Sequence, residues 1–91
     1  MKQAKYSESI LDNNEWCYKC GSTQYIQRHE IFFGRNRQNS KKYGCWVHLC
    51  GKCHDIVHFG KDKTLREDLQ RECRDKFIEL YGEEKFREIF N

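Results

Sequence analysis

The sequence predicts a small α+β domain in which two Cys-x-x-Cys pairs enclose a two-stranded hairpin and helices follow. The first observation is the position of the pairs, Cys17/Cys20 and Cys50/Cys53, on either side of a segment with β-strand character. The second is a C-terminal third in which apolar residues recur at helical spacing. We expect a single domain over residues 15–91, preceded by a polar N-terminal tail over residues 1–14.

Length and composition explain why such a domain needs a metal. A chain of 91 residues buries only a modest share of its apolar surface. Charged residues make up 34% of the chain and the mean hydropathy is −1.02, so little apolar material is left for a core. A metal or a disulfide is the expected reinforcement in so small a domain.

The cysteine content favours a metal over disulfides. The six cysteines follow an N-terminus that has no apolar run of signal-peptide length. We therefore expect a cytoplasmic, reducing compartment, where paired cysteines more often bind a metal than each other. No stretch is long and apolar enough to cross a membrane, so no membrane partner is predicted.

The predicted elements follow in a simple order. Residues 17–21 (CYKCG) predict a tight turn, because Gly21 permits positive φ. Residues 25–33 predict a strand, residues 34–44 a polar loop, and residues 45–49 a second strand antiparallel to the first. The second Cys-x-x-Cys pair predicts the start of a short helix that runs through His58.

The C-terminal third predicts two helices. Thr64 and Glu67 have the spacing of a capping box, which predicts the start of the longer helix. Gly82 predicts its end, and residues 83–90 predict a last short helix. The apolar stripe of the longer helix is typical of core packing: Leu65, Leu69, Cys73, Phe77 and Leu80.

The two Cys-x-x-Cys pairs predict a structural zinc site. Each pair supplies two thiolates from one turn, and the hairpin between them brings the pairs together for tetrahedral coordination. The alternatives are four free buried cysteines or a pair of redox motifs. Cys45 and Cys73 fall outside the pattern and are interpreted as small core residues.

Three histidines predict a second metal site. His54 and His58 are four residues apart on the expected helix, so both project from one face. His29 comes from the first strand, which the cysteine pairs would hold beside that helix. Three imidazoles leave coordination positions open, as catalytic metal sites do. The alternative is that all three are ordinary polar positions; His48 is interpreted as incidental.

These motifs together resemble those of a known family. The run of Cys17-x-x-Cys20-Gly21, then Arg-His-Glu-Ile at 28–31, then Leu-Cys-x-x-Cys-His-x-x-x-His at 49–58 is similar to the HNH endonucleases, also called His-Me finger or ββα-metal nucleases. The small zinc-stapled HNH proteins of phages and prophages resemble it best. The resemblance covers residues 17–82 and implies a ββα-metal fold with C-terminal helices.

The resemblance also implies roles for individual residues. His29 matches the position of a metal ligand, and His54 and His58 match the remaining ligands. Glu30 occupies the position where the family has its general-base histidine; in a register one residue away, His29 itself would be the base. The middle asparagine of the family has no match, because Cys45 stands at its position, and Asn36 or Asn39 would have to replace it.

The function implied is a metal-dependent DNA endonuclease that nicks one strand at a time. It would use structural Zn²⁺ and one catalytic divalent cation, Mg²⁺, Mn²⁺, Ni²⁺ or Zn²⁺, in a bacterial host or phage-infected cell. The loop between the strands would hold the phosphate backbone through four cations, or it is a merely solvated basic turn: Arg35, Arg37, Lys41 and Lys42. The alternative function is a non-catalytic zinc-ribbon module that binds nucleic acid or a protein partner.

Overall fold

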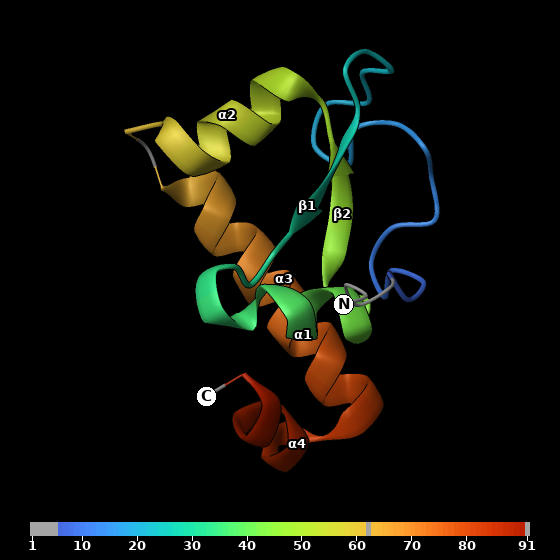
Figure 1. The fold of residues 1–91 in the computed structure, drawn as a ribbon, viewed down its shortest axis with the longest axis vertical. Coiled ribbons are helices and arrows are strands. Elements are labelled where there is room, and N and C mark those ends of the chain that lie inside the picture. Colours follow the sequence, from blue (N-terminus) through green and yellow to red (C-terminus); the bar gives the residue numbers. More distant parts are fainter. Residues whose placement is uncertain (1–5, 62, 91) are drawn as a thin grey trace, which may run out of the picture.

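An antiparallel hairpin lies at the centre of the structure, a computed structural model that describes residues 6–61 and 63–90 (Figure 1). Strand β1 (Gln27–Glu30) pairs with β2 (Trp46–Leu49), and the register sets Gln27 opposite Leu49 and Glu30 opposite Trp46. Helices follow the sheet, so the described chain has the predicted α+β class. The two predicted strands and their antiparallel pairing are confirmed.

Strand β1 is shorter than the predicted span of 25–33. Tyr25 adopts a φ of +52°, a left-handed conformation that interrupts an extended strand. After Glu30 the chain turns: the backbone N–H of Phe32 donates to Ser40 Oγ, and this hydroxyl donates to the carbonyl of Phe32. The apolar residues that follow the strand, Ile31 among them, therefore pack in the core beyond the sheet.

The segment between the strands is helical, and the prediction of a loop over residues 34–44 was wrong. It contains a 3₁₀ turn, η1 (Gly34–Asn36), and a short helix, α1 (Arg37–Lys42). The segment offers no apolar stripe, so helical periodicity is absent from its sequence. Tertiary contacts stabilise α1 instead, because Ser40 is fully buried and bonded to Phe32, and Lys41 is 3% exposed.

The three remaining helices agree with the predictions: α2 (Gly51–Phe59), α3 (Thr64–Tyr81) and α4 (Glu83–Ile89). Gly82, with a φ of +95°, ends α3 and connects it to α4. The predicted capping box is wrong, because Thr64 is already the first helical residue and the N-cap residue Lys63 makes no side-chain capping bond. Within the described ranges, no helix has the length and apolar character that a membrane span requires.

One core joins the sheet to the helices. Val47 and Leu49 of β2, Val57 of α2 and Phe77 of α3 are almost fully buried in it. Cys45 and Cys73 are fully buried in the same cluster, which confirms their interpretation as core residues. A hydrogen bond with the Cys45 thiol and burial both raise the pKa of Cys73, so this thiol stays protonated.

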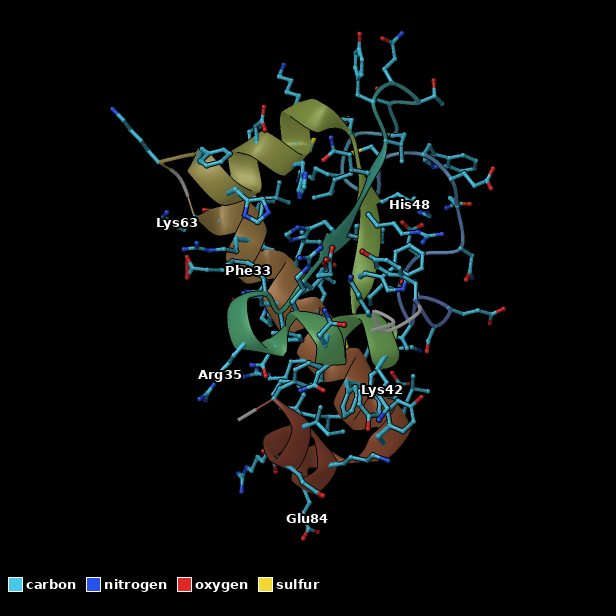
Figure 2. All side chains as sticks on the ribbon, in the orientation of Figure 1. Phe33, Arg35, Lys42, His48, Lys63 and Glu84 are labelled. Atoms are coloured by element: carbon cyan, nitrogen blue, oxygen red, sulfur yellow. The ribbon has the colours of Figure 1, made fainter. Side chains whose placement is uncertain are left out.

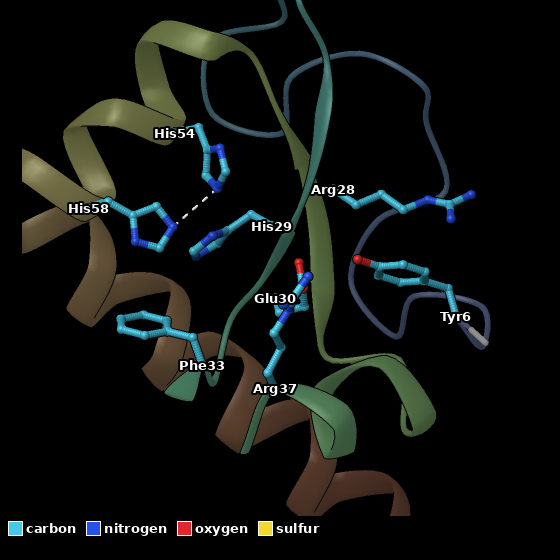
Figure 3. A pocket seen from close by; sticks show the side chains of 8 residues that line it. All are labelled: Tyr6, Arg28, His29, Glu30, Phe33, Arg37, His54 and His58. Carbon is cyan, nitrogen blue, oxygen red and sulfur yellow. Dashed lines mark hydrogen bonds and ion pairs between the residues drawn. The ribbon is translucent and has the colours of Figure 1, made fainter. Parts of the chain in front are cut away.

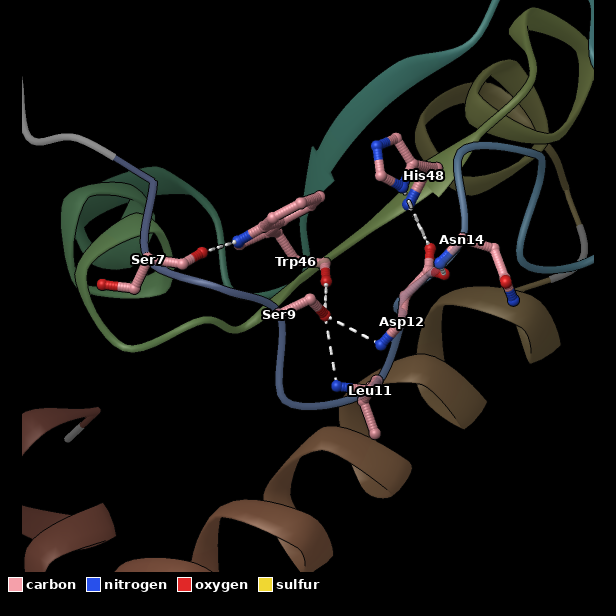
Figure 4. Close-up of polar contacts among 7 residues, drawn as sticks. All are labelled: Ser7, Ser9, Leu11, Asp12, Asn14, Trp46 and His48. Atoms are coloured by element: carbon pink, nitrogen blue, oxygen red, sulfur yellow. Dashed lines mark hydrogen bonds and ion pairs between the residues drawn. The ribbon is translucent and has the colours of Figure 1, made fainter.

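Residues 6–14 form no helix or strand, yet they dock along the free edge of β2 (Figure 4). Asp12 is 5% exposed and accepts the backbone N–H of His48 at 2.9 Å. The hydroxyl of Ser9 donates to the carbonyl of Trp46, and the indole N–H of Trp46 donates to the carbonyl of Ser7. Part of the expected tail, residues 6–14, therefore covers an otherwise unpaired strand edge, and residues 1–5 lie outside the described residues.

Candidate metal centres

The four predicted zinc cysteines lie together. The sulfurs of Cys17, Cys20, Cys50 and Cys53 all lie within 4.8 Å of one another. Two turns hold them: the backbone N–H of Cys20 donates to Cys17 Sγ, and that of Cys53 donates to Cys50 Sγ. Gly21 has the positive φ, +78°, expected after the first pair. Four sulfurs in two such turns form a donor set that can hold a metal ion and that fits zinc.

The electrostatics of the cysteine group also suit a cation. Burial raises the pKa of Cys17, but backbone N–H groups donate to its sulfur and outweigh burial, which brings the pKa to about 6. Burial and the neighbouring sulfurs raise the pKa of Cys53. The pKa values of sulfurs this close diverge because they compete for protons, and a divalent cation removes that competition by binding them as thiolates.

The three predicted histidines form a second group. One ring nitrogen each of His29, His54 and His58 lies within 4.8 Å of the others. His29 projects from β1 toward α2, where His54 and His58 lie one turn apart, as Figure 3 shows. The Nε2 atoms of His54 and His58 are 3.1 Å apart. This geometry follows from helical spacing on α2 and from the packing of that helix against β1.

A hydrogen bond directs the lone pair of His54 toward the other two rings. The side-chain oxygen of Gln27 lies 2.5 Å from His54 Nδ1. Because an amide oxygen only accepts, Nδ1 carries the proton and Nε2 is the nitrogen free to ligate. Among the described residues, His29 Nε2 is the buried side-chain nitrogen or oxygen without a hydrogen-bond partner. An unpartnered buried nitrogen facing two others fits a metal ion.

Two of the histidines, His29 and His54, are also kept neutral. His29 is 1% exposed, and burial lowers its pKa to about 4, with the charges of His54 and His58 acting in the same direction. Burial, followed by the charge of His58, lowers the pKa of His54 as well. Neutral imidazoles are the form that binds a metal, so these two side chains are ready for one at neutral pH.

The histidine group opens into a cavity of about 310 Å³. Phe33 and the three histidines line one part of it, and residues of β1, of α1 and of the N-terminal segment line the rest (Figure 3). The full lining consists of Tyr6, Arg28, His29, Glu30, Phe33, Arg37, His54 and His58. The cavity gives the ring nitrogens access to an external ligand, which the cysteine group lacks except at its exposed member, Cys20.

Glu30 follows His29 on β1 and lines the same cavity, but its carboxylate is taken up by an arginine. Its carboxylate oxygen Oε1 lies 2.6 Å from Arg37 Nε, and its side chain is 10% exposed. Burial raises the pKa of Glu30, but the bond from Arg37 and smaller contributions from its own backbone N–H and the Tyr6 hydroxyl hold it below the usual value. Glu30 is therefore an ionised partner of Arg37 on the cavity wall.

The four cations predicted to bind phosphate do not form one patch. Arg37 lines the cavity, whereas Lys41 is buried with its ammonium 5.3 Å from the centre of the Tyr6 ring. Arg35 and Lys42 are exposed on η1 and α1, as Figure 2 shows. Their role in phosphate binding stays a prediction, and Arg37 is the member placed beside the histidines.

The asparagines and the fourth histidine have structural contacts. Asn39 donates its side-chain N–H to the carbonyl of Ile89, so it connects α1 to α4. Asn36 is the N-cap residue of α1 and makes no side-chain capping bond. His48, interpreted as incidental, lies with Nδ1 3.3 Å from Asp12 Oδ2 and helps to hold the N-terminal segment.

Sequence reasoning missed three residues of the histidine site. Arg28 shares the outward face of β1 with Glu30, and a strict period-2 reading of the strand would have placed it there. Gln27 and Tyr6 carried no such signal, because each reaches the site through a contact between distant segments. Comparison of the chain with known protein families, with curated proteins and with solved structures finds no match, so its site is defined by geometry alone.

Proposed function

We propose that the protein is a metal-dependent endonuclease that hydrolyses DNA phosphodiester bonds and nicks one strand at a time. The observation that carries the proposal is the convergence of His29, His54 and His58 on an open cavity, with an unpartnered buried nitrogen on His29. Three protein ligands with an open position are typical of catalytic metal sites. The cysteine group would be the structural zinc site that stabilises the fold.

The order of the elements supports this proposal. Two antiparallel strands followed by a helix, with one histidine on β1 and two on α2, is the arrangement that the resemblance to the ββα-metal nucleases of the HNH class implies. The same resemblance has Glu30 at the position of the general base, but here Glu30 is bonded to Arg37. The proposal therefore depends most on His29.

Side chains at this site would contribute to hydrolysis in three ways. A divalent ion bound by the imidazoles would stabilise the charge that develops on the phosphate and on the leaving 3′ oxygen. His29, neutral at neutral pH, serves as a ligand or accepts the proton of the attacking water. Arg28 and Arg37 bring positive charge to the same cavity, where it can hold the phosphate backbone.

A nicking assay on supercoiled plasmid tests the proposal. The wild-type protein is incubated with Mg²⁺, Mn²⁺, Ni²⁺ or Zn²⁺, and conversion to the open circle is followed on a gel. His29→Ala and His54→Ala should lose activity by about two orders of magnitude or more. His48→Ala is the matched control, because this imidazole faces Asp12. Equal activity of His54→Ala and wild type would reject the proposed site.

One observation favours a second function, a non-catalytic zinc-ribbon module that binds nucleic acid or a protein partner. Glu30, at the general-base position, has its carboxylate bonded to Arg37. The two functions differ in metal content, because a ribbon module needs only the zinc of the cysteine group. Elemental analysis after dialysis against Zn²⁺ or Ni²⁺ separates them: one metal per chain together with no nicking favours the module.

A further inference from the structure

We propose that Glu30 is a positioning residue that holds Arg37 as a phosphate-binding side chain at the edge of the histidine cavity. This inference rests on the proposed function, because it assigns the nucleic-acid backbone as the ligand of Arg37. It gives Glu30 a role different from that of a proton acceptor. The ligand class is an oxyanion of a phosphodiester, which the planar guanidinium recognises through paired donors.

The first argument is the asymmetry of the ion pair. The Glu30 side chain is 10% exposed, whereas that of Arg37 is 57% exposed, and the bond between them is 2.6 Å long. The buried partner is thus held by the fold, and the exposed partner is held by the buried one. The bond uses Nε of Arg37, so the two terminal nitrogens of the guanidinium can donate to an external oxyanion.

The second argument is the way the chain brings the pair together. Arg37 begins α1, and the hydrogen bonds between Ser40 and Phe32 hold this helix against the end of β1. Arg37 comes seven positions after Glu30, with the short turn η1 between them, so the pair closes a short local loop of the chain. The geometry of the pair is therefore set by backbone bonds as well as by its own charge.

The third argument is the charge around Glu30. The guanidinium carbon of Arg28 lies 4.5 Å from the centre of the Tyr6 ring, and the Lys41 ammonium lies 5.3 Å from it. The Tyr6 hydroxyl interacts with the Glu30 carboxylate. The Glu30 carboxylate thus contacts Arg37 directly and a tyrosine ring that carries two further cations. We expect loss of the Glu30 charge to free Arg37 from its fixed place.

The location of the pair suits a phosphate that also reaches the histidines. Arg37 and the three histidines line the same cavity. A group that positions a substrate oxyanion must be exposed and fixed, and Arg37 is both. A general base must instead present a free oxygen to the attacking water. Oε1 of Glu30 is bonded to Arg37, and the carboxylate also accepts from the Tyr6 hydroxyl.

Equilibrium binding separates these roles without any cleavage. A short fluorescein-labelled DNA duplex is titrated with zinc-loaded protein in the absence of other divalent ions, and anisotropy is recorded over a range of salt concentrations. The variants are Arg37→Ala, Arg37→Lys, Glu30→Gln and the double variant Glu30→Gln/Arg37→Ala. Arg87→Ala is the matched control, because Arg87 forms an exposed pair with Glu83 on α4.

We expect Arg37→Ala to weaken binding by about tenfold and to reduce the salt slope by about one. Glu30→Gln should also weaken binding, although it removes a negative charge and simple electrostatics predicts tighter binding. The double variant should bind no more weakly than Arg37→Ala, because both changes remove one interaction. Arg37→Lys keeps the charge but loses the Nε donor, so its affinity should fall while its salt slope stays near that of the wild type.

Three results would overturn the inference: no binding of the duplex by the wild-type protein, unchanged or tighter binding by Glu30→Gln, or additive losses in the double variant. Arg37 is exposed, so Arg37→Lys folds even if Glu30→Gln does not, and wild-type affinity in Arg37→Lys also overturns it. The proposed function fails separately. If Glu30→Gln and Arg37→Ala both weaken binding but the wild-type protein does not nick DNA, the positioning pair is retained and the endonuclease is rejected. If the wild-type protein nicks DNA but Arg37→Ala binds and nicks as it does, the endonuclease is retained and the positioning pair is rejected.

Discussion

The cysteine group and the histidine group use the same helix and differ in what they leave open. Cys53 and His54 are neighbours on α2, yet Cys53 faces the core and His54 faces the cavity. The cysteine group supplies four ligand atoms, enough to close a tetrahedral shell, whereas the histidine group supplies three. One helix therefore carries ligands for a closed site and for an open site.

In so small a domain, one turn can fix the position of both groups. Cys50 is the N-cap residue of α2, and its sulfur accepts the N–H of Cys53. The turn that can hold a structural metal thus sets where the helix begins, and with it the direction of His54 and His58. We infer that the closed site stabilises the fold and orients the open site. Substitution of a cysteine should therefore disturb the histidine group, whereas substitution of a histidine should leave the cysteine group intact.

The largest effect is expected from Cys50→Ser. Serine keeps an N-cap acceptor but loses the thiolate. Structural zinc contributes roughly 10–16 kcal/mol in zinc-finger peptides, which is comparable to the whole free energy of unfolding of a small domain. We expect loss of the cooperative thermal transition and of tightly bound zinc. Cys73→Ala is the control and should cost about 1 kcal/mol. A cooperative transition retained by Cys50→Ser would contradict the structural role of this group.

His54→Ala is expected to remove the second metal and leave the fold. The variant should retain one zinc and the far-UV circular dichroism of the wild type, and its affinity for a second Zn²⁺ or Ni²⁺ should fall by about 100-fold or more. Isothermal titration with either ion measures this. Loss of both metals on this change would show that the histidine group supports the fold as the cysteine group does, and the two groups would not differ in this respect.

A smaller effect is expected from Gln27→Leu. The side-chain oxygen of Gln27 fixes the tautomer of His54, and loss of such outer partners typically lowers metal affinity by about 10–100-fold. The same titration should show a weaker second site, with the zinc of the cysteine group unchanged. Gln24→Leu, an exposed position before β1, is the matched control. Equal affinities of the two variants would remove Gln27 from the site.

The smallest effect is expected from Asp12→Ala at the edge of β2, away from both groups. Asp12 accepts the backbone N–H groups of His48 and Asn14 in part-buried bonds, so its removal should cost about 1 kcal/mol of unfolding free energy. Urea unfolding measures it. Asp75→Ala, at an exposed pair with Arg74, should change little. A negligible loss in Asp12→Ala would make the N-terminal segment a loose tail.

Much of both groups could be predicted from sequence because their ligands have short, regular spacings. A Cys-x-x-Cys pair brings two sulfurs together within one turn, and His54 and His58 share a face because they are four residues apart on a helix. Helix α3 was predictable for the same reason, from its apolar stripe. Helix α1 was not, because its polar sequence is held by contacts with other segments.

The two Cys-x-x-Cys pairs, the pair of His54 and His58, and the strands and helices other than η1 and α1 follow from the sequence alone, because each depends on spacing within one element. Only the tertiary structure decided that Glu30 pairs with Arg37, that Gln27 supports His54 and that Tyr6 reaches the cavity. Those three contacts depend on how a strand edge, a short helix and the N-terminal segment pack together. Residue spacing does not predict such packing, because side chains far apart in the chain meet only when the core has formed.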